Sequence, residues 1–457
     1  MMRAMPHVTI ARPRAPTALL RARFARSVLE VLRALDAAGY RSWLVGGTVR
    51  DVLLRRGRAG TDLDVATPAR PQEVLRLFPK VIPTGIEHGT VTVLAHGRPV
   101  EVTTFRGEGA YEDGRRPSSV TFLDDVDEDL ARRDFTVNAL AWDPIGKEFR
   151  DPFGGRADLR ARLLRAVGDP AARFAEDGLR PVRAARFAAQ LGFRVEPATA
   201  AAIPGALATT ARVSVERTTE ELSRLVVASH ARRGLDLLDG TGLLGVLLPD
   251  LAGLGSIARR HAFDVAGAVP RDLALRMAAL LHVLAQARPA AAAGARVREV
   301  LSAMRFPGHV RDAAAIAVAE HGCLLAAGGA APPESAAEVR RWLSRVGRER
   351  VPSVLALWRG DAEAVRPAPR SRRERAALDA FVARVRRVER AGPPLAPSEL
   401  ALDGRAVMSI LQLSPGPAVG AALRHLLDRV LEDPALNTRA RLTSELRAWW
   451  ATRPSPG

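Results

Sequence analysis

The hydrophobic pattern of the chain changes near residue 155, from short alternating runs to long helical ones. Residues 27–39 place apolar side chains at intervals of three and four before Gly39, which predicts a helix that ends at this glycine. Between residues 40 and 150 the apolar residues fall in short runs separated by turn residues, which indicates strands. These runs are 41–47, 62–67, 89–97, 98–106 and 134–142.

After residue 155 nearly every segment has the spacing of an amphipathic helix. Stretches rich in Gly, Pro and Ala interrupt the pattern at 287–298, 326–336 and 366–374, where we expect linkers or long turns. The predicted fold class is therefore α+β, with a small sheet-containing domain followed by a long helical arm. No apolar run approaches the roughly 18 residues that a bilayer-spanning helix needs, so we expect no membrane association.

Composition indicates a class of partner. The net charge is +18, carried almost wholly by arginine, and this excess of base over acid favours a polyanion such as nucleic acid. Cys323 is the only cysteine, which excludes a disulfide framework and a cysteine metal site and is typical of a cytoplasmic protein. The first 26 residues are rich in arginine and contain no acid, and we interpret them as a disordered basic extension.

The double glycine at 46–47 follows an apolar run and precedes a helical one. Glycines at such a junction let backbone N–H groups approach an anion, and the helix N-terminus adds a favourable dipole. Arg50 and Asp51 fall in the first turn of that helix, where an ion pair is plausible. A simple turn is the alternative interpretation.

Two aspartates one residue apart suggest a metal site. On a strand, Asp62 and Asp64 point to the same face while Leu63 points into the core. Adjacent carboxylates repel one another unless a cation lies between them, so the pair favours a divalent metal. Glu101 alternates with Val100 and Val102 on a later strand and is a candidate third carboxylate, or else an exposed strand residue. Nucleotidyl transfer uses a phosphate-binding turn beside a pair of carboxylates that bind metal.

These residues, and the segments that follow them in order, resemble the class II tRNA nucleotidyltransferases and bacterial poly(A) polymerases of the polymerase-β superfamily. The resemblance implies a polymerase-β-like head with a small mixed sheet, followed by an all-α neck, body and tail. It covers about residues 40–193. Its further segments are "TGIEHGTVTVL" (84–94), "VEVTTFR" (100–106), "RRDFTVNALAWDP" (132–144), "DPFGGRADL" (151–159) and "RFAEDGLRPVRAARFAAQLGF" (173–193).

The resemblance implies roles for individual residues. Asp62 and Asp64 match the metal-binding pair, for which Mg²⁺ is expected. Six residues match the nucleotide-holding turn and the groups that hold the triphosphate and ribose, and a guanidinium fork and a carboxylate–amide pair suit those ligands. They are Gly46, Gly47, Arg50, Arg133 and the pair Asp134 and Asn138. The alternative for Asp134 and Asn138 is a local hydrogen-bonded pair.

In "EDGLR", Asp177 and Arg180 match the pair that the family uses to read the incoming base, and Arg183 matches a triphosphate-binding arginine. We expect Asp177 and Arg180 to be neighbours on one helix face, being three residues apart. An ordinary surface salt bridge is the alternative. Pro181 replaces the methionine that is common there, and we expect it to kink the helix and disturb the base-reading geometry.

Two later stretches faintly resemble the HD phosphohydrolase domain that some relatives carry. The resemblance lacks its His-Asp doublet, because Val283 follows His282. We therefore expect no phosphohydrolase activity, and we interpret His261 and His282 as packing or surface histidines. The stretch 394–442 resembles the family's tail and predicts helices joined by Gly/Pro turns. Arginine-rich helices in this arm would bind the RNA backbone.

The predicted function is template-independent addition of C, C and A to the tRNA 3′ end from CTP and ATP, with contacts to the acceptor arm. Addition of only CC, of only A, or of poly(A) remains open, as does a catalytically silent RNA-binding protein. The segment 106–124 is a candidate for a flexible loop that CC-only enzymes lack. The expected domains are an extension (1–26), the head (27–152), a neck with the base-reading motif (153–225), a body (226–330) and a tRNA-binding tail (331–457).

Overall fold

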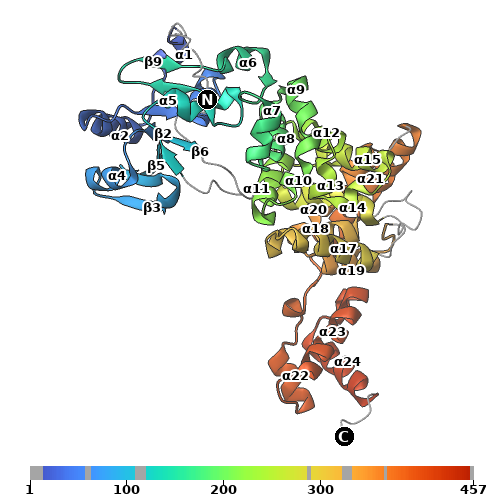
Figure 1. Ribbon diagram of the computed structural model, residues 1–457. Coiled ribbons are helices and arrows are strands. Elements are labelled where there is room, and N and C mark those ends of the chain that lie inside the picture. The colour runs from blue at the N-terminus through green and yellow to red at the C-terminus, as the bar shows by residue number, and fades with distance from the viewer. Residues whose placement is uncertain are drawn as a thin grey trace. The chain divides into compact units, whose positions relative to one another are not determined.

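The computed structural model divides the chain into two compact units, residues 1–249 and 250–457 (Figure 1). We describe each unit by itself. The structure describes residues 14–56, 63–108, 120–285, 290–321, 332–364 and 368–452. Among these residues no helix combines the length and apolar character needed to cross a membrane.

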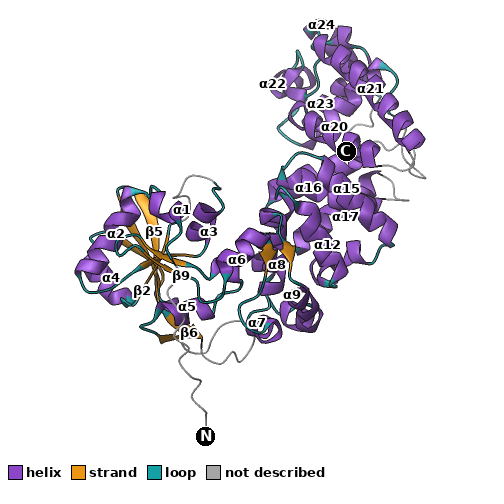
Figure 2. Cartoon of the chain, turned by 90° about the horizontal axis from the view of Figure 1, so that it is seen from above, coloured by secondary structure: helices purple, strands orange, loops and turns teal. Residues whose placement is uncertain are grey.

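A seven-stranded mixed sheet forms the centre of the first unit (Figure 2). Its spatial order is β3-β4-β5-β2-β1-β8-β9, in which β2 and β5 are parallel and the other neighbours antiparallel. The strands are β1 (Trp43–Val45), β2 (Asp64–Thr67), β3 (Val81–Gly85), β4 (Thr90–Ala95), β5 (Arg98–Thr104), β8 (Ala141–Asp143) and β9 (Glu148–Arg150). The polymerase-β-like head and its small mixed sheet are confirmed.

Alternation along the strands gives the sheet two different faces. Helix α2 (Arg26–Ala37) buries Val31 and Leu35 completely and packs against β2, β4 and β5, which confirms the predicted helix. Helices α3 (Gly47–Leu53), α4 (Pro71–Leu77) and α5 (Val126–Ala131) also belong to the head. Trp43, Ala66 and Phe105 form a second apolar cluster with residues of α5. Apolar burial on both faces fixes the register of the central strands.

The rest of the first unit is helical apart from two short two-stranded pairs in its described residues. One is an antiparallel pair in the head, and the other is the parallel pair β10 (Leu163–Leu164) with β11 (Arg194–Val195), which the expectation of an all-α neck missed. Helix α8 packs against α11 and α12. The helices are α6 (Gly155–Ala161), α7 (Pro170–Glu176), α8 (Arg180–Leu191), α9 (Pro197–Ala202), α10 (Leu207–Thr210), α11 (Val215–Val226), α12 (Ala231–Gly240) and α13 (Leu243–Leu247).

The second unit contains only helices in its described residues. They include α15 (Ser256–Ala268), α16 (Leu273–Leu281), the short 3-10 helix η4 (His282–Ala285), α17 (Ala290–Ala303), α18 (Gly308–Glu320), α19 (Ala336–Val346), α20 (Val351–Ala364), α21 (Ala368–Arg390), α22 (Gly404–Leu411), α23 (Pro417–Glu432) and α24 (Arg439–Ala451). The last three confirm the helices expected over 394–442.

Several local predictions were wrong. Most of the expected linkers at 287–298 and 366–374 are helical, in α17 and α21 respectively, because runs of Ala and Arg are strong helix formers. Within the expected disordered extension, Thr17–Arg21 forms a helix (α1) that buries Leu19. The expected boundary at residue 225 falls inside the first unit, because α12 packs on α8.

Candidate active site

Two carboxylates meet at the middle of the sheet. Asp64 opens β2 and is the register partner of Glu101 on the parallel strand β5, so both side chains project from the same face. Glu101 is exposed and Asp64 is partly buried, while Leu63 is buried as predicted. Asp62 lies outside the described residues. A pair of carboxylates on one face suits a hard cation such as Mg²⁺, which prefers oxygen ligands.

The double glycine forms a tight junction between β1 and α3. Gly46 has a φ of 63°, a conformation that favours glycine, and Gly47 begins the helix as predicted. A Cβ on Gly46 would lie 2.9 Å from Nη1 of Arg133. The close approach leaves this guanidinium beside the turn, and its Nε is buried without a hydrogen-bond partner among the described residues. An unpartnered buried donor beside a helix N-terminus fits an anionic ligand.

A chain of hydrogen bonds links this junction to α8. Nη1 of Arg50 donates to Oδ1 of Asn138 at 2.6 Å, and Nδ2 of Asn138 donates to Oδ1 of Asp134 at 3.0 Å. Nε of Arg183 donates to the other oxygen of Asp134 at 2.7 Å. The structure thus brings together Arg50, Asn138, Asp134 and Arg183. It also contains the local Asp134–Asn138 pair that was the alternative, and the predicted ion pair between Arg50 and Asp51, at 2.9 Å.

Asp134 is ionised within this buried network. Burial alone would raise the pKa of its carboxyl, but the charge of Arg183, together with hydrogen bonds from Asn138, Arg183 and the Phe135 backbone, lowers the pKa to about 2. The network therefore holds two guanidinium groups in fixed positions through one permanent negative charge.

Asp177 and Arg180 contact each other through the backbone, where the N–H of Arg180 donates to the Asp177 carbonyl at 3.0 Å. Asp177 ends α7 in an extended conformation, and Arg180 begins α8, so the two are not on one helix face. The Asp177 carboxylate lies 3.3 Å from Nη2 of Arg217 and accepts from the Leu179 backbone. Arg180 is buried, pairs with Glu176 and donates to the Arg132 carbonyl at 3.0 Å. Three-residue spacing was misleading because a turn lies between the helices.

Pro181 does not kink the helix, contrary to our expectation. It lies in the first turn of α8, where backbone N–H groups have no partner within the helix. The proline ring therefore removes no intrahelical hydrogen bond at this position, and its fixed φ suits the start of a helix.

Sequence reasoning missed three buried supports of the site. Asp129 on α5 is almost fully buried and pairs with Arg132 at 2.8 Å and with Arg133 at 3.2 Å. Glu221 on α11 accepts from Arg186 at 2.5 Å and lies 3.7 Å from Arg183. The third support, Phe187, lies under the guanidinium groups of Arg50, Arg183 and Arg186. For Asp129 and Glu221, the only signal in the sequence was an acidic residue at an inward-facing position of a helix.

Comparison with known proteins agrees with this geometry. A model of the poly(A) polymerase head domain matches residues 42–165, and a model of the probable RNA- and SrmB-binding site of polymerase A matches residues 192–254. The CCA-adding enzyme of Geobacillus thermodenitrificans (strain NG80-2) is 39% identical over 420 residues, which are 91% of this chain and 95% of the relative. The chain belongs to the CCA-adding enzyme family.

Other members extend the comparison. The CCA-adding enzyme of Geobacillus stearothermophilus is 37% identical over the same shares of the two chains. The crystal structure of the Bacillus stearothermophilus CCA-adding enzyme in complex with CTP matches with a TM-score of 0.72 and 33% identity, covering 94% of this chain and 98% of that one. The Thermotoga maritima CCA-adding enzyme complexed with tRNA, at 18% identity and a TM-score of 0.61, shows the shared fold.

The segment expected to contain a flexible loop, 106–124, is described only at its ends. There β6 (Arg106–Glu108) pairs with β7 (Val120–Phe122) in an antiparallel ribbon. The guanidinium of Arg70 lies 4.6 Å from the centre of the Phe122 ring, which fastens the ribbon to the start of α4. Residues 109–119, which contain most of the expected loop, lie outside the described residues.

Proposed function

We infer that this chain adds CCA to the 3′ end of tRNA, using CTP and ATP and releasing pyrophosphate. The observation that carries this conclusion is 37–39% identity to CCA-adding enzymes over nine-tenths of the chain. The site has what the reaction requires: carboxylates on one strand face and a glycine junction lined with guanidinium groups. A similar enzyme was crystallised with CTP. The CC-only, A-only and poly(A) alternatives have no comparable support, and neither does a silent RNA-binding protein.

The glycine junction is proposed to hold the triphosphate. Gly46 and Gly47 allow backbone N–H groups to reach phosphate oxygens, and Arg133 offers the buried Nε that has no partner among the described residues. Arg50 and Arg183 add positive charge from either end of the Asp134–Asn138 network. Because this network is already bonded, the guanidinium groups need little reorganisation when the nucleotide binds.

Asp62, Asp64 and Glu101 are proposed to hold Mg²⁺. The shared strand face of Asp64 and Glu101 and their oxygen donors fit this ion. Bound divalent ions in such sites neutralise charge on the transferred phosphate and lower the pKa of the attacking hydroxyl. The carboxylates orient the RNA end toward the phosphate held by the glycine junction.

Asp177 and Arg180 are proposed to select the base. A carboxylate acceptor and a guanidinium donor suit the Watson–Crick edges of cytosine and adenine, whereas guanine and uracil present reversed donors and acceptors. In the structure Asp177 pairs with Arg217 and Arg180 pairs with Glu176. Both ion pairs therefore have to open, or rearrange, when a nucleotide enters.

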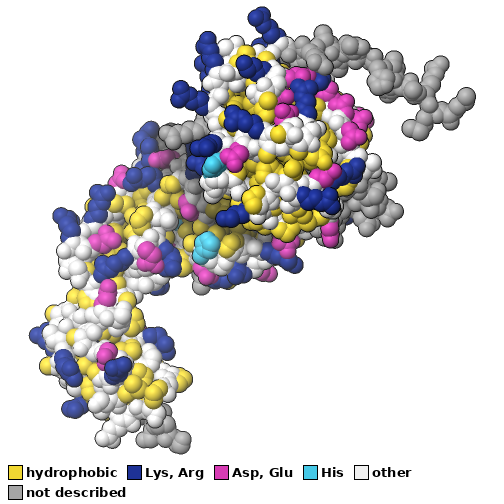
Figure 3. Space-filling model, turned by 90° about the vertical axis from the view of Figure 1, so that its left-hand side faces the viewer, with side chains coloured by type: hydrophobic (Ala, Val, Ile, Leu, Met, Phe, Trp, Pro, Cys, Tyr) yellow, Lys and Arg dark blue, Asp and Glu magenta, His cyan; other side chains and the backbone are white. Residues whose placement is uncertain are grey.

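The helical second unit, which includes the tail beyond residue 331, is proposed to bind tRNA. Figure 3 shows arginine and lysine side chains spread over the visible surface and interspersed with fewer acidic ones. Such a distribution suits contacts to an RNA backbone at many separate phosphates.

Stepwise addition tests the function. Transcripts of one tRNA that end at the discriminator base, at C, at CC and at CCA are each given one labelled nucleotide triphosphate at a time. A CCA-adding enzyme extends the first two with CTP, the third with ATP and the last with neither. A CC transcript that is not extended with ATP, extension that occurs only with ATP on the CC transcript, or extension of the CCA transcript with ATP would identify one of the alternatives.

A further inference from the structure

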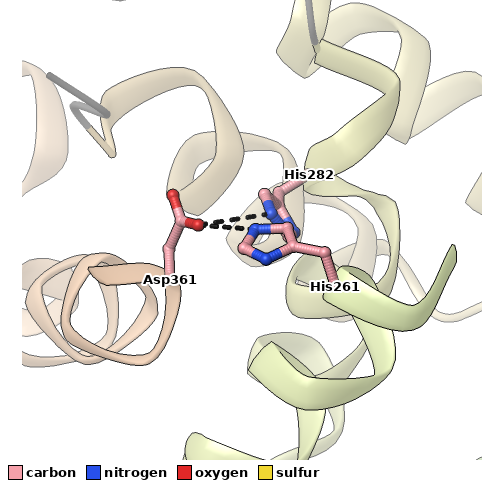
Figure 4. Close-up of side chains that lie close together, drawn as sticks. All are labelled: His261, His282 and Asp361. Atoms are coloured by element: carbon pink, nitrogen blue, oxygen red, sulfur yellow. Dashed lines mark hydrogen bonds and ion pairs between the residues drawn. The ribbon is translucent and has the colours of Figure 1, made fainter. Parts of the chain in front are cut away.

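Two histidines and one aspartate from distant parts of the second unit meet in its interior (Figure 4), and a third histidine lies beside them. His261 lies on α15, His282 begins η4, His321 follows α18, and Asp361 lies on α20. Their rings and carboxylate are buried, and only His261 retains partial exposure, at 20% of its side chain. The ring centres of His261 and His282 lie 5.1 Å apart, and those of His282 and His321 lie 5.6 Å apart.

Backbone contacts determine which ring nitrogens carry protons. Nδ1 of His282 lies 2.7 Å from the Ala279 carbonyl, and Nδ1 of His321 lies 2.9 Å from the Val318 carbonyl. A carbonyl oxygen only accepts, so each Nδ1 is the donor. In a neutral ring the other nitrogen, Nε2, then presents a lone pair. This arrangement, with one nitrogen fixed by an outer partner, is typical of histidines that bind metal.

Both lone pairs face the Asp361 carboxylate. Nε2 of His282 lies 3.7 Å from Oδ1, and Nε2 of His321 lies 3.7 Å from Oδ2. Nε2 of His282 is buried and has no hydrogen-bond partner among the described residues. Acceptors that face one another in a buried place repel unless a cation lies between them.

A proton does not explain the distances. An imidazolium that donated to the carboxylate would lie about 2.8 Å from it, which is where His261 lies but not His282 or His321. Two ligands about 2.1 Å from one zinc ion in tetrahedral geometry are themselves about 3.4 Å apart. The observed 3.7 Å between His282 and Asp361 is close to this value.

We propose that His261, His282 and Asp361 bind a divalent transition-metal ion of the zinc class, which displaces the proton that lies between His261 and Asp361. One ligand atom of each of the three lies within 4.8 Å of the others, and imidazole nitrogen with carboxylate oxygen is a donor set that suits zinc. The ion joins α15, η4 and α20, which are separated by up to 100 residues in sequence, and so stabilises the second unit. This site is independent of the proposed nucleotidyl transfer.

Zinc binding by the untagged full-length protein tests the proposal. The protein is stripped with EDTA and returned to a buffer with excess Mg²⁺, which occupies the carboxylates of the head. ZnCl₂ is then titrated calorimetrically, and bound zinc is counted by mass spectrometry. We expect one tightly bound zinc ion per chain and a melting temperature raised by several degrees.

Variants locate the ion. Asp361→Asn keeps the shape of the side chain, accepts from His261 and offers an amide N–H to a histidine lone pair, so it should remain folded. It should weaken zinc binding by about 100-fold or more. This loss is larger than the usual effect of removing a residue that only hydrogen-bonds to a metal ligand. His261→Gln, at the most exposed ligand, should do the same. His309→Ala, at an exposed histidine of α18, is the matched control and should bind like the wild type.

Two outcomes would overturn the proposal. One is a wild-type protein that binds no zinc and gains no thermal stability from it. The other is zinc binding that stays unchanged in Asp361→Asn and His261→Gln, since the ion would then lie elsewhere. Circular dichroism of each variant separates loss of the site from loss of the fold.

Discussion

At the scale of single residues, the head depends on charges held in fixed places. Asp64 and Glu101 were predicted from the alternation of a strand, and the register of two parallel strands brings them together. The polar network around Asp134 could be predicted only in part. Asp134 and Asn138 were identified, but Asp129 and Glu221 were not, because their burial depends on helices distant in sequence.

Replacement of Asp64 tests the carboxylate pair. Asp64→Asn should lower the rate of nucleotide addition by at least about 100-fold, because the variant lacks a preorganised negative charge that stabilises the transition state. Binding of tRNA should stay within a few-fold of the wild-type value, as measured by filter binding. Asp36→Asn, on the exposed side of α2, is the control and should keep full activity. Substantial turnover by Asp64→Asn at saturating MgCl₂ would contradict the assignment.

The pKa of Asp134 predicts how stability depends on pH. Its folded-state value of about 2 lies below the ordinary value of 3.8, so ionised Asp134 stabilises the fold above about pH 4. This contribution is lost as the pH falls through about 2. Asp134→Asn should lower the free energy of unfolding by about 2 kcal/mol at neutral pH, the typical value for a lost charged hydrogen bond.

Urea denaturation of both proteins across this pH range measures the effect. The difference between them should be constant from about pH 5 to pH 8 and should shrink in strong acid. A variant as stable as the wild type at pH 7 would show that Arg183 does not depend on this carboxylate.

Selection of the base can be separated from triphosphate binding. Asp177→Ala should admit UTP or GTP comparatively better, by about tenfold or more, because unpaired buried groups no longer penalise the wrong base. Arg183→Ala should weaken all four nucleotides alike, since a triphosphate carries no base identity. Single-nucleotide addition to tRNA that ends at the discriminator base measures both. Full discrimination by Asp177→Ala would place selection elsewhere.

At the scale of elements, the periodic segments were predicted well, but the linkers and turns between them were not. The helix over 27–39 follows its apolar spacing, whereas 287–298 resembled a linker only because it contains Pro, Gly and Ala. The turn between α7 and α8 was missed because Asp177 and Arg180 were assigned to one helix, although Gly178 and Pro181 interrupt that stretch. Such boundaries depend on packing that a local window of sequence does not contain.

The place of Pro181 leads to an element-scale prediction. Pro181→Ala should change the free energy of unfolding by less than about 1 kcal/mol and leave base discrimination unchanged, because the first turn of α8 does not use this N–H. Ala188→Pro, in the interior of the same helix, should cost about 3 kcal/mol or more. Chemical denaturation compares the two. A change of nucleotide preference in Pro181→Ala would show that proline shapes the base site.

At the scale of the whole molecule, the chain divides into two units at residue 249, and the expected boundary between neck and body at residue 225 lies within the first of them. The sequence analysis singled out His261 and His282 but interpreted them as packing or surface histidines, because Asp361 lies 100 residues from His261 in the sequence.

Truncation tests whether the first unit binds nucleotides and the second unit binds tRNA. A protein that ends at Pro249 should fold and bind ATP and CTP, but should lose most of its affinity for tRNA. One that ends at residue 225 should unfold more easily, because α8 loses the buried Leu235 and Leu238 of α12. Affinity of the full chain for tRNA should fall steeply with added salt. Equal affinity for tRNA in the full chain and in residues 1–249 would contradict the proposed role of the second unit.

The central claim is that the chain builds CCA without a nucleic-acid template. The most direct measurement is to sequence the 3′ ends of a tRNA transcript that lacks CCA, after incubation with the protein and all four nucleotide triphosphates together. The account predicts that C, C and A are added in that order and that addition then stops. Ends that finish at CC, that carry a run of A, or that contain G or U would contradict it.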